Sequence, residues 1–126
     1  MQNQKSALGL DGNITALLGY IVGIIALVLI FIEKDNKFVR FHAFQSVLWA
    51  AVYIVVIIAL SIVGVIVAIL AQASGTLGTI LGLLLTLVWL ACVFGFLGGL
   101  IYAAIKAFGG NQAKLPFVGG MAEKWA

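Results

Sequence analysis

The chain has 126 residues, of which 64% are hydrophobic and only 9% are charged. Soluble domains are about 45–50% apolar and about 25% charged, so this composition excludes a water-soluble globule. The formal net charge of +3 comes from 7 basic and 4 acidic residues, which is too sparse for nucleic-acid binding. The apolar runs are continuous and do not alternate, so we predict an all-α membrane protein with a single integral membrane domain over residues 1–126.

The first apolar run covers residues 14–32 and contains no charge. A helix of this length measures about 28 Å, close to one hydrocarbon thickness. Asn13 can cap its start, and Glu33 and Lys34 follow its end. A cleaved signal peptide is the alternative, but no small-residue cleavage pattern follows the run. We therefore predict a retained membrane span over residues 14–32.

Two longer uncharged runs follow, over residues 47–71 and 77–105. The short polar break at residues 72–76 suits a tight turn. Both runs exceed the minimum length of a span, which favours tilting or protrusion at an interface. The chain is therefore predicted to have three transmembrane helices.

Residues 33–46 begin polar and become amphipathic. Asp35 or Asn36 can cap a helix that continues into the second span. One side of that helix carries Phe38, Phe41, His42, Gln45 and Trp49. Aromatic residues beside Lys and Arg are typical interface anchors, so an amphipathic interfacial extension is predicted before the second span.

His42 has two interpretations. It can be a ligand, a proton-sensing group or part of a partner site, or it can be a polar cap that holds two helix ends together. A single His without a nearby carboxylate favours the cap. His42 and Gln45 can share a hydrogen bond at i+3 or reach the head of the third span.

The tail over residues 109–126 contains Pro116 and glycine pairs that cannot continue the third helix. Its apolar residues predict a tail that folds back onto the membrane surface. These residues are Leu115, Phe117, Val118, Met121 and Trp125.

Small residues at helical spacing predict close helix packing. The predicted packing residues are Gly19 and Gly23 in the first span and Gly78, Gly82, Gly95, Gly99 and Ala103 in the third. Packing within the chain explains any one pair. The longer ridge in the third span can also serve a partner; it comprises Ala91, Gly95, Gly99, Ala103 and Ala107.

Six of the seven basic residues fall in the first loop and the C-terminal tail, whereas the second turn has none. With three spans these two segments share one side. The excess of Lys and Arg on cytoplasmic loops makes that side cytoplasmic. We therefore predict a multi-pass protein of the cell (inner) membrane with its N-terminus outside.

Residues 38–46 and 114–119 resemble the two hallmark segments of the Tic-Twenty-like small membrane proteins, which include magnetosome membrane proteins of the MamF kind. The motif positions are Phe38, Arg40, His42, Gln45, Lys114 and Pro116. The resemblance implies a small helical membrane protein of unknown function. It carries no established catalytic residue to this chain.

No Asp, Glu, Lys, Arg or His lies between Val47 and Ile105, which argues against a pump or an ion-coupled carrier. No nucleophile–base pair is present, and Cys92 fits a buried apolar thiol. We expect a non-enzymatic scaffold or accessory subunit without catalytic residues, cofactor or metal. Its expected partners are membrane lipid and either a second copy or another integral membrane protein, not nucleic acid. An oligomeric channel or protein-translocation component is the alternative.

Overall fold

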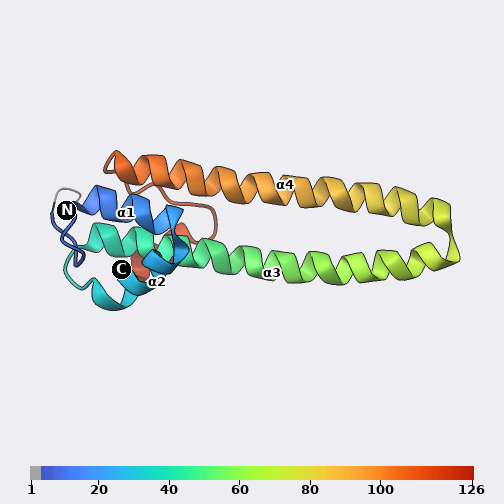
Figure 1. Ribbon diagram of the computed structural model, residues 1–126, viewed down its shortest axis with the longest axis horizontal. Helices are drawn as coiled ribbons and strands as arrows, with labels where there is room; N and C mark the ends of the chain where they lie inside the picture. The colour runs from blue at the N-terminus through green and yellow to red at the C-terminus, as the bar shows by residue number, and fades with distance from the viewer. Residues whose placement is uncertain (1–3) are drawn as a thin grey trace. The chain divides into compact units, whose positions relative to one another are not determined.

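The structure is a computed structural model that describes residues 4–126, and within them it is all-helical, as predicted (Figure 1). Contacts divide the chain into two compact units. The charge-free unit is Ala51–Leu97, and the polar unit is residues 4–50 together with 98–126. The five helices in the described range are α1 (Gly12–Ile21), α2 (Gly23–Ile32), α3 (Lys37–Ala73), α4 (Gly75–Phe108) and α5 (Gly119–Trp125).

Two helices, α3 and α4, are long and apolar enough to cross a membrane. The charge-free unit takes residues 51–73 from α3 and 75–97 from α4, 23 residues from each. At 1.5 Å per residue each stretch measures about 35 Å, which suffices for a hydrocarbon core of about 30 Å. We treat these two stretches as the membrane-spanning segments, so the predicted second and third spans lie in helices that are able to cross.

The turn between α3 and α4 is formed at Ser74. Its hydroxyl accepts a hydrogen bond from the Leu77 N–H at 3.2 Å, which caps the start of α4. Close by, a Cβ added to Gly78 would overlap Ala71 of α3. Glycine at position 78 therefore lets the two backbones approach directly after the turn.

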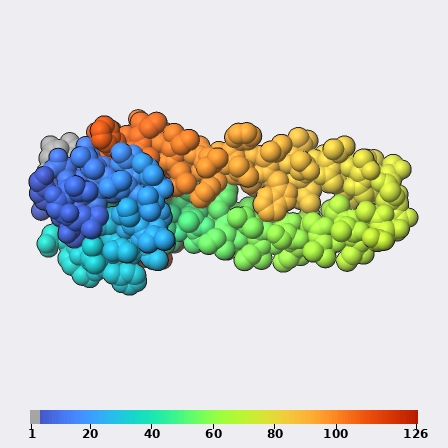
Figure 2. Space-filling view, viewed as in Figure 1, coloured from blue at the N-terminus to red at the C-terminus, as the bar shows by residue number. Residues whose placement is uncertain are grey.

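The first predicted span is not confirmed as one continuous helix. Val22 adopts an extended conformation (φ −121°, ψ 99°) and separates α1 from α2. The two helices turn back on each other, and their side chains form one continuous surface (Figures 1 and 2). Each has 10 residues and is about 15 Å long, too short to cross a bilayer. Gly19 of α1 faces Ala26 of α2 across the fold-back, where an added Cβ would make an ordinary van der Waals contact at 3.6 Å with the Ala26 Cβ.

The predicted placement of the N-terminus opposite the first loop is not shown either, and the contacts of the N-terminal segment run against it. The Ala7 N–H donates a 2.6 Å hydrogen bond to Glu33 Oε2. The Asn36 side-chain amide donates a 3.0 Å hydrogen bond to the Gln4 carbonyl. Segments in such contact cannot lie on opposite sides of a bilayer. The break at Val22 turns α2 back along α1, which brings Glu33 close to the N-terminal segment.

The predicted extension before the second span is present as the first turns of α3. Asn36 Oδ1 accepts a hydrogen bond from the Val39 N–H at 3.3 Å, which confirms the predicted cap. Phe38, Phe41 and Trp49 are buried within the polar unit. These aromatic side chains therefore pack against protein, and the prediction that they anchor the chain at the lipid interface is wrong.

The end of α4 has a defined geometry. Gly110 has φ 83°, the Asn111 N–H bonds to the Lys106 carbonyl at 2.8 Å, and the Gly110 N–H bonds to the Ala107 carbonyl at 3.0 Å. This is a Schellman motif, which requires a left-handed residue and so favours glycine. It redirects the chain into the linker over residues 111–118.

The tail divides its apolar residues between two environments. Leu115 and Val118 are buried in the polar unit, whereas Phe117, Met121 and Trp125 are exposed. The short helix α5 starts at a glycine pair and was not predicted from the sequence. A Cβ on the first glycine, Gly119, would overlap Lys114, so close packing explains its presence there.

Candidate functional site

Polar side chains from two helices meet inside the polar unit. The Tyr20 hydroxyl of α1 lies 2.7 Å from Nδ1 of His42 in α3. The Gln45 side-chain amide donates a 2.8 Å hydrogen bond to the same hydroxyl. His42 and Gln45 are thus bridged by Tyr20, a residue that the sequence analysis did not single out. The signal in the sequence was its phenol hydroxyl, one of two hydroxyl groups in the apolar run over residues 14–32.

The same side chains hold the linker after α4. His42 Nε2 lies 3.0 Å from the Asn111 carbonyl, and Gln45 Nε2 donates to the Ala113 carbonyl at 2.9 Å. Gln45 Oε1 accepts from the Leu115 N–H at 2.8 Å. A carbonyl can only accept, so the His42 proton sits on Nε2 and Nδ1 accepts from Tyr20. The buried network therefore joins α1, α3 and the linker.

The environment of His42 keeps its ring neutral. The side chain is fully buried, and the rings of Tyr20, Phe38 and Phe41 meet it edge-on at centroid distances of 5.4, 4.6 and 4.9 Å. Burial lowers the pKa of His42 to about 4, and the hydrogen bond to Asn111 opposes part of this shift. Burial also raises the pKa of Tyr20. Both groups are uncharged at neutral pH.

The network is fully satisfied among the described residues: each buried side-chain nitrogen or oxygen there has a hydrogen-bond partner. Ser46 donates to the Gly19 carbonyl at 2.9 Å, and the hydroxyls of Ser6 and Thr15 lie 2.7 Å apart. Unpaired buried polar groups cost about 1–3 kcal/mol each, so a closed network favours one arrangement of the segments.

Arg40 is a second junction. Its guanidinium donates to the carbonyls of Ile30 at 3.3 Å, Glu33 at 2.5 Å and Ala126 at 3.3 Å. It also lies 5.3 Å from the centroid of the Phe44 ring. A cation at the last carbonyls of α2 complements the negative end of that helix. Arg40 thereby ties α2 and the end of α5 to α3.

The tail motif residues Lys114 and Pro116 adjoin the residues that Gln45 holds, but their own contacts lie within the tail. Lys114 forms an ion pair with Glu123 of α5. The Pro116 carbonyl accepts a 2.8 Å hydrogen bond from the Val118 N–H, and the intervening Phe117 has φ 69°. These contacts shape the turn into α5.

The predicted packing residues differ in how closely other side chains approach them. A Cβ on Gly99 would lie 2.5 Å from Cζ2 of Trp49, and Ala103 is fully buried; both lie in the polar unit. In the charge-free unit a Cβ on Gly95 would lie 3.0 Å from the Tyr53 hydroxyl. Gly23 and Gly82 have no described atom within 4 Å of an added Cβ, so the structure does not bring them into close packing.

These features define a small helical membrane protein with two long apolar helices and a polar unit closed by hydrogen bonds. The chain belongs to the MamF/MmsF family, described as the magnetosome magnetite crystal formation protein family, whose model matches residues 5–122. The MamF-type part of the resemblance is thereby confirmed, whereas the Tic-Twenty-like name finds no support in the comparisons.

Archaeal membrane proteins are similar over most of the chain. A UPF0132 membrane protein of Methanocaldococcus jannaschii is 32% identical over 124 residues, covering 97% of this chain and 94% of the relative. One from Archaeoglobus fulgidus is 35% identical over 113 residues, covering 90% and 89%. A second from M. jannaschii is 28% identical over 120 residues, covering 94% and 73%. No solved structure matches the chain.

Proposed function

We propose that this protein is a non-enzymatic scaffold or accessory subunit of a membrane protein complex. The proposal rests on the hydrogen bonding and burial of His42, the only histidine in the sequence. Both ring nitrogens are hydrogen-bonded and the side chain is fully buried. A general acid or base has to reach the proton that it transfers, whereas His42 holds three segments together.

The charge-free unit supports a role in association. Its outward side chains are apolar, as lipid or another transmembrane helix requires. Gly82 on α4 has open space where a Cβ would lie, so a partner helix can approach the backbone there. The proposed partner is a second copy of the chain or another integral membrane protein.

We further propose that all seven basic residues face the cytoplasm in the inner membrane. The seven are Lys5, Lys34, Lys37, Arg40, Lys106, Lys114 and Lys124. All belong to the polar unit, and two spans that go out and back keep that unit on one side. The contact between Ala7 and Glu33 supports adding the N-terminus to this side. Cytoplasmic segments carry the excess of Lys and Arg.

The complex is tested by purification from the native membrane into lipid discs, followed by measurement of particle mass and protein content. We expect particles heavier than a monomer, holding further copies or a stoichiometric second membrane protein. Gly82→Leu should reduce the assembly while leaving the thermal stability of the monomer unchanged. Strictly monomeric particles without another protein would refute the proposal. Voltage-dependent conductance of liposomes carrying the protein would instead support the oligomeric channel.

A further inference from the structure

A cavity of about 350 Å³ lies within the polar unit, between the start of α3, the linker and α5. Small-molecule sites typically measure about 300–1,000 Å³, so the cavity can hold a small polar group. The lining residues are Lys37, Phe41, Gln112, Glu123, Lys124 and Ala126. None of them belongs to the hydrogen bonds around Tyr20.

The charges around this cavity favour an anion. Glu123 is paired with Lys114, whereas neither Lys37 nor Lys124 forms an ion pair with a described residue. Arg40, one turn after Lys37, donates to the backbone oxygens of Ile30, Glu33 and Ala126 and adds a further positive charge near the cavity. Lys37 also stands at the N-terminus of α3, the positive end of the helix dipole.

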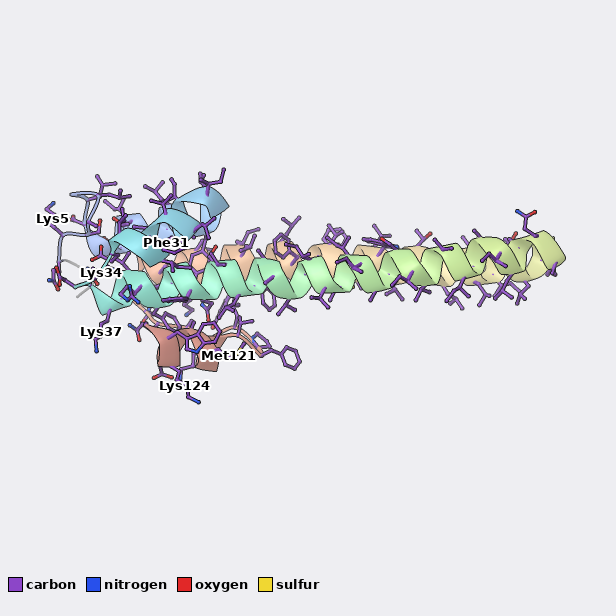
Figure 3. The ribbon with its side chains drawn as sticks, turned by 90° about the horizontal axis from the view of Figure 1, so that it is seen from below. Lys5, Phe31, Lys34, Lys37, Met121 and Lys124 are labelled. Carbon is purple, nitrogen blue, oxygen red and sulfur yellow. The ribbon has the colours of Figure 1, made fainter. Side chains whose placement is uncertain are left out.

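The surface beside the cavity is apolar. Met121 and Trp125, which share α5 with the lining residues Glu123 and Lys124, are exposed. In Figure 3, Lys37 and Lys124 lie on the side of the first turns of α3 that carries Met121, whereas Phe31 lies on the opposite side. Exposed aromatic and apolar side chains beside lysines suit an amphipathic anion. A ligand here therefore meets positive charge and an apolar surface together.

We propose that this cavity binds the phosphate group of an anionic phospholipid. Lys37 and Lys124 make the ionic contacts, the Gln112 amide donates a hydrogen bond, and Met121 and Trp125 contact the apolar part of the lipid. Free phosphate carries the same group but offers nothing to the apolar residues. The lipid therefore binds more tightly than the free ion.

The test uses the full chain in an uncharged detergent, with lipid adducts measured by native mass spectrometry. Phosphatidylglycerol should bind at least about fivefold more tightly than zwitterionic phosphatidylcholine. Lys37→Gln and Lys124→Gln should each weaken phosphatidylglycerol binding about fivefold, and Lys124→Arg should retain it. Lys34→Gln is the matched control, because Lys34 is exposed and does not line the cavity. Glu123→Gln should strengthen binding, since it removes the carboxylate from the lining.

Three results would overturn the proposal. Equal binding of the two lipids would show that the cavity does not select an anion. An equal loss in Lys34→Gln would show that net charge alone attracts the lipid. Inorganic phosphate that binds as tightly as phosphatidylglycerol would make the site one for the free ion. Circular dichroism of each variant keeps loss of folding separate from loss of the site, and the gain expected in Glu123→Gln cannot come from unfolding.

Discussion

The hydroxyl of Tyr20 accepts a hydrogen bond from Gln45 and donates one to His42, so one oxygen links α1 to α3. Tyr20→Phe should lower the free energy of unfolding by about 1–3 kcal/mol, because it leaves buried polar groups without a partner. The measurement is thermal or chemical unfolding in detergent.

Tyr102→Phe is the matched control for this substitution. The Tyr102 side chain is 50% exposed, and its ring contact with Lys106 does not need the hydroxyl. Its stability should change by less than about 0.5 kcal/mol. Equal losses in the two variants would contradict a structural role for the buried network.

Acid should destabilise the protein through His42. Its pKa of about 4 in the folded chain lies below the ordinary 6.5, so only the unfolded chain gains this proton between those values. The contribution is fully present above pH 6.5 and is lost as pH falls to about 4. It amounts to something on the order of 3 kcal/mol.

The His42 contribution is isolated by comparing unfolding of the native chain and His42→Gln at several pH values. The variant should be less stable at pH 7.5 but should lose less stability on acidification. Parallel profiles for the two proteins would show that other groups cause the acid sensitivity.

Phe117 holds a left-handed backbone conformation, with φ 69°, while its side chain is 89% exposed. A non-glycine residue pays roughly 1–2 kcal/mol for this conformation. The buried neighbours Leu115 and Val118 maintain it. Phe117→Gly should therefore raise the unfolding free energy in detergent by about 1 kcal/mol. Phe117→Ala should give no such gain, because alanine keeps the backbone strain. A gain of equal size in both variants would show that relief of backbone strain is not the cause.

Among the helices, the contact between the first half of α3 and the last third of α4 depends on one glycine. A Cβ on Gly99 would lie 2.5 Å from the ring of Trp49, and the indole is buried. Gly99→Ala should lower the unfolding free energy by about 1–3 kcal/mol, and Gly99→Leu by more. Unfolding of the purified monomer measures both.

The adjacent Gly98 provides the control, because a Cβ there meets no described atom within 4 Å. Gly98→Ala should be neutral or stabilising by about 0.5–1 kcal/mol, since alanine favours the helix. The two neighbouring substitutions therefore have opposite expected signs. A similar loss in both would contradict the Trp49 contact as the cause, because helix propensity favours both substitutions.

At the scale of the whole molecule, the break at Val22 changes the topology. Single cysteines at Leu8, Lys34 and Ser74, in a Cys92→Ala background, should separate into two classes with a membrane-impermeant reagent. Positions 8 and 34 should stay unlabelled in intact cells, and position 74 should react. If positions 8 and 74 react while position 34 stays unlabelled, the first span is continuous and the N-terminus lies outside.

The membrane class, the helical fold and the two long spans followed from the sequence, because uncharged runs longer than a bilayer admit few other structures. The cap at Asn36 was equally predictable, since it depends on neighbouring residues alone. The break at Val22 was not predictable, because length and hydropathy are the same for one span and for two short helices. Contact between Gly19 and Ala26, and between Ala7 and Glu33, decides between them.

The motif residues His42 and Gln45 were recognisable in the sequence, but their partners were not. Those partners are Tyr20, 22 residues before His42, and carbonyls about 70 residues after it. Periodicity reports which residues share a face of one helix, and it carries no information on which distant segment covers that face. The sequence by itself determined the membrane helices and the polar character of the start of α3. Only the tertiary structure decided that these polar groups hydrogen-bond to α1 and to the linker, because each needs a partner that its own helix cannot provide.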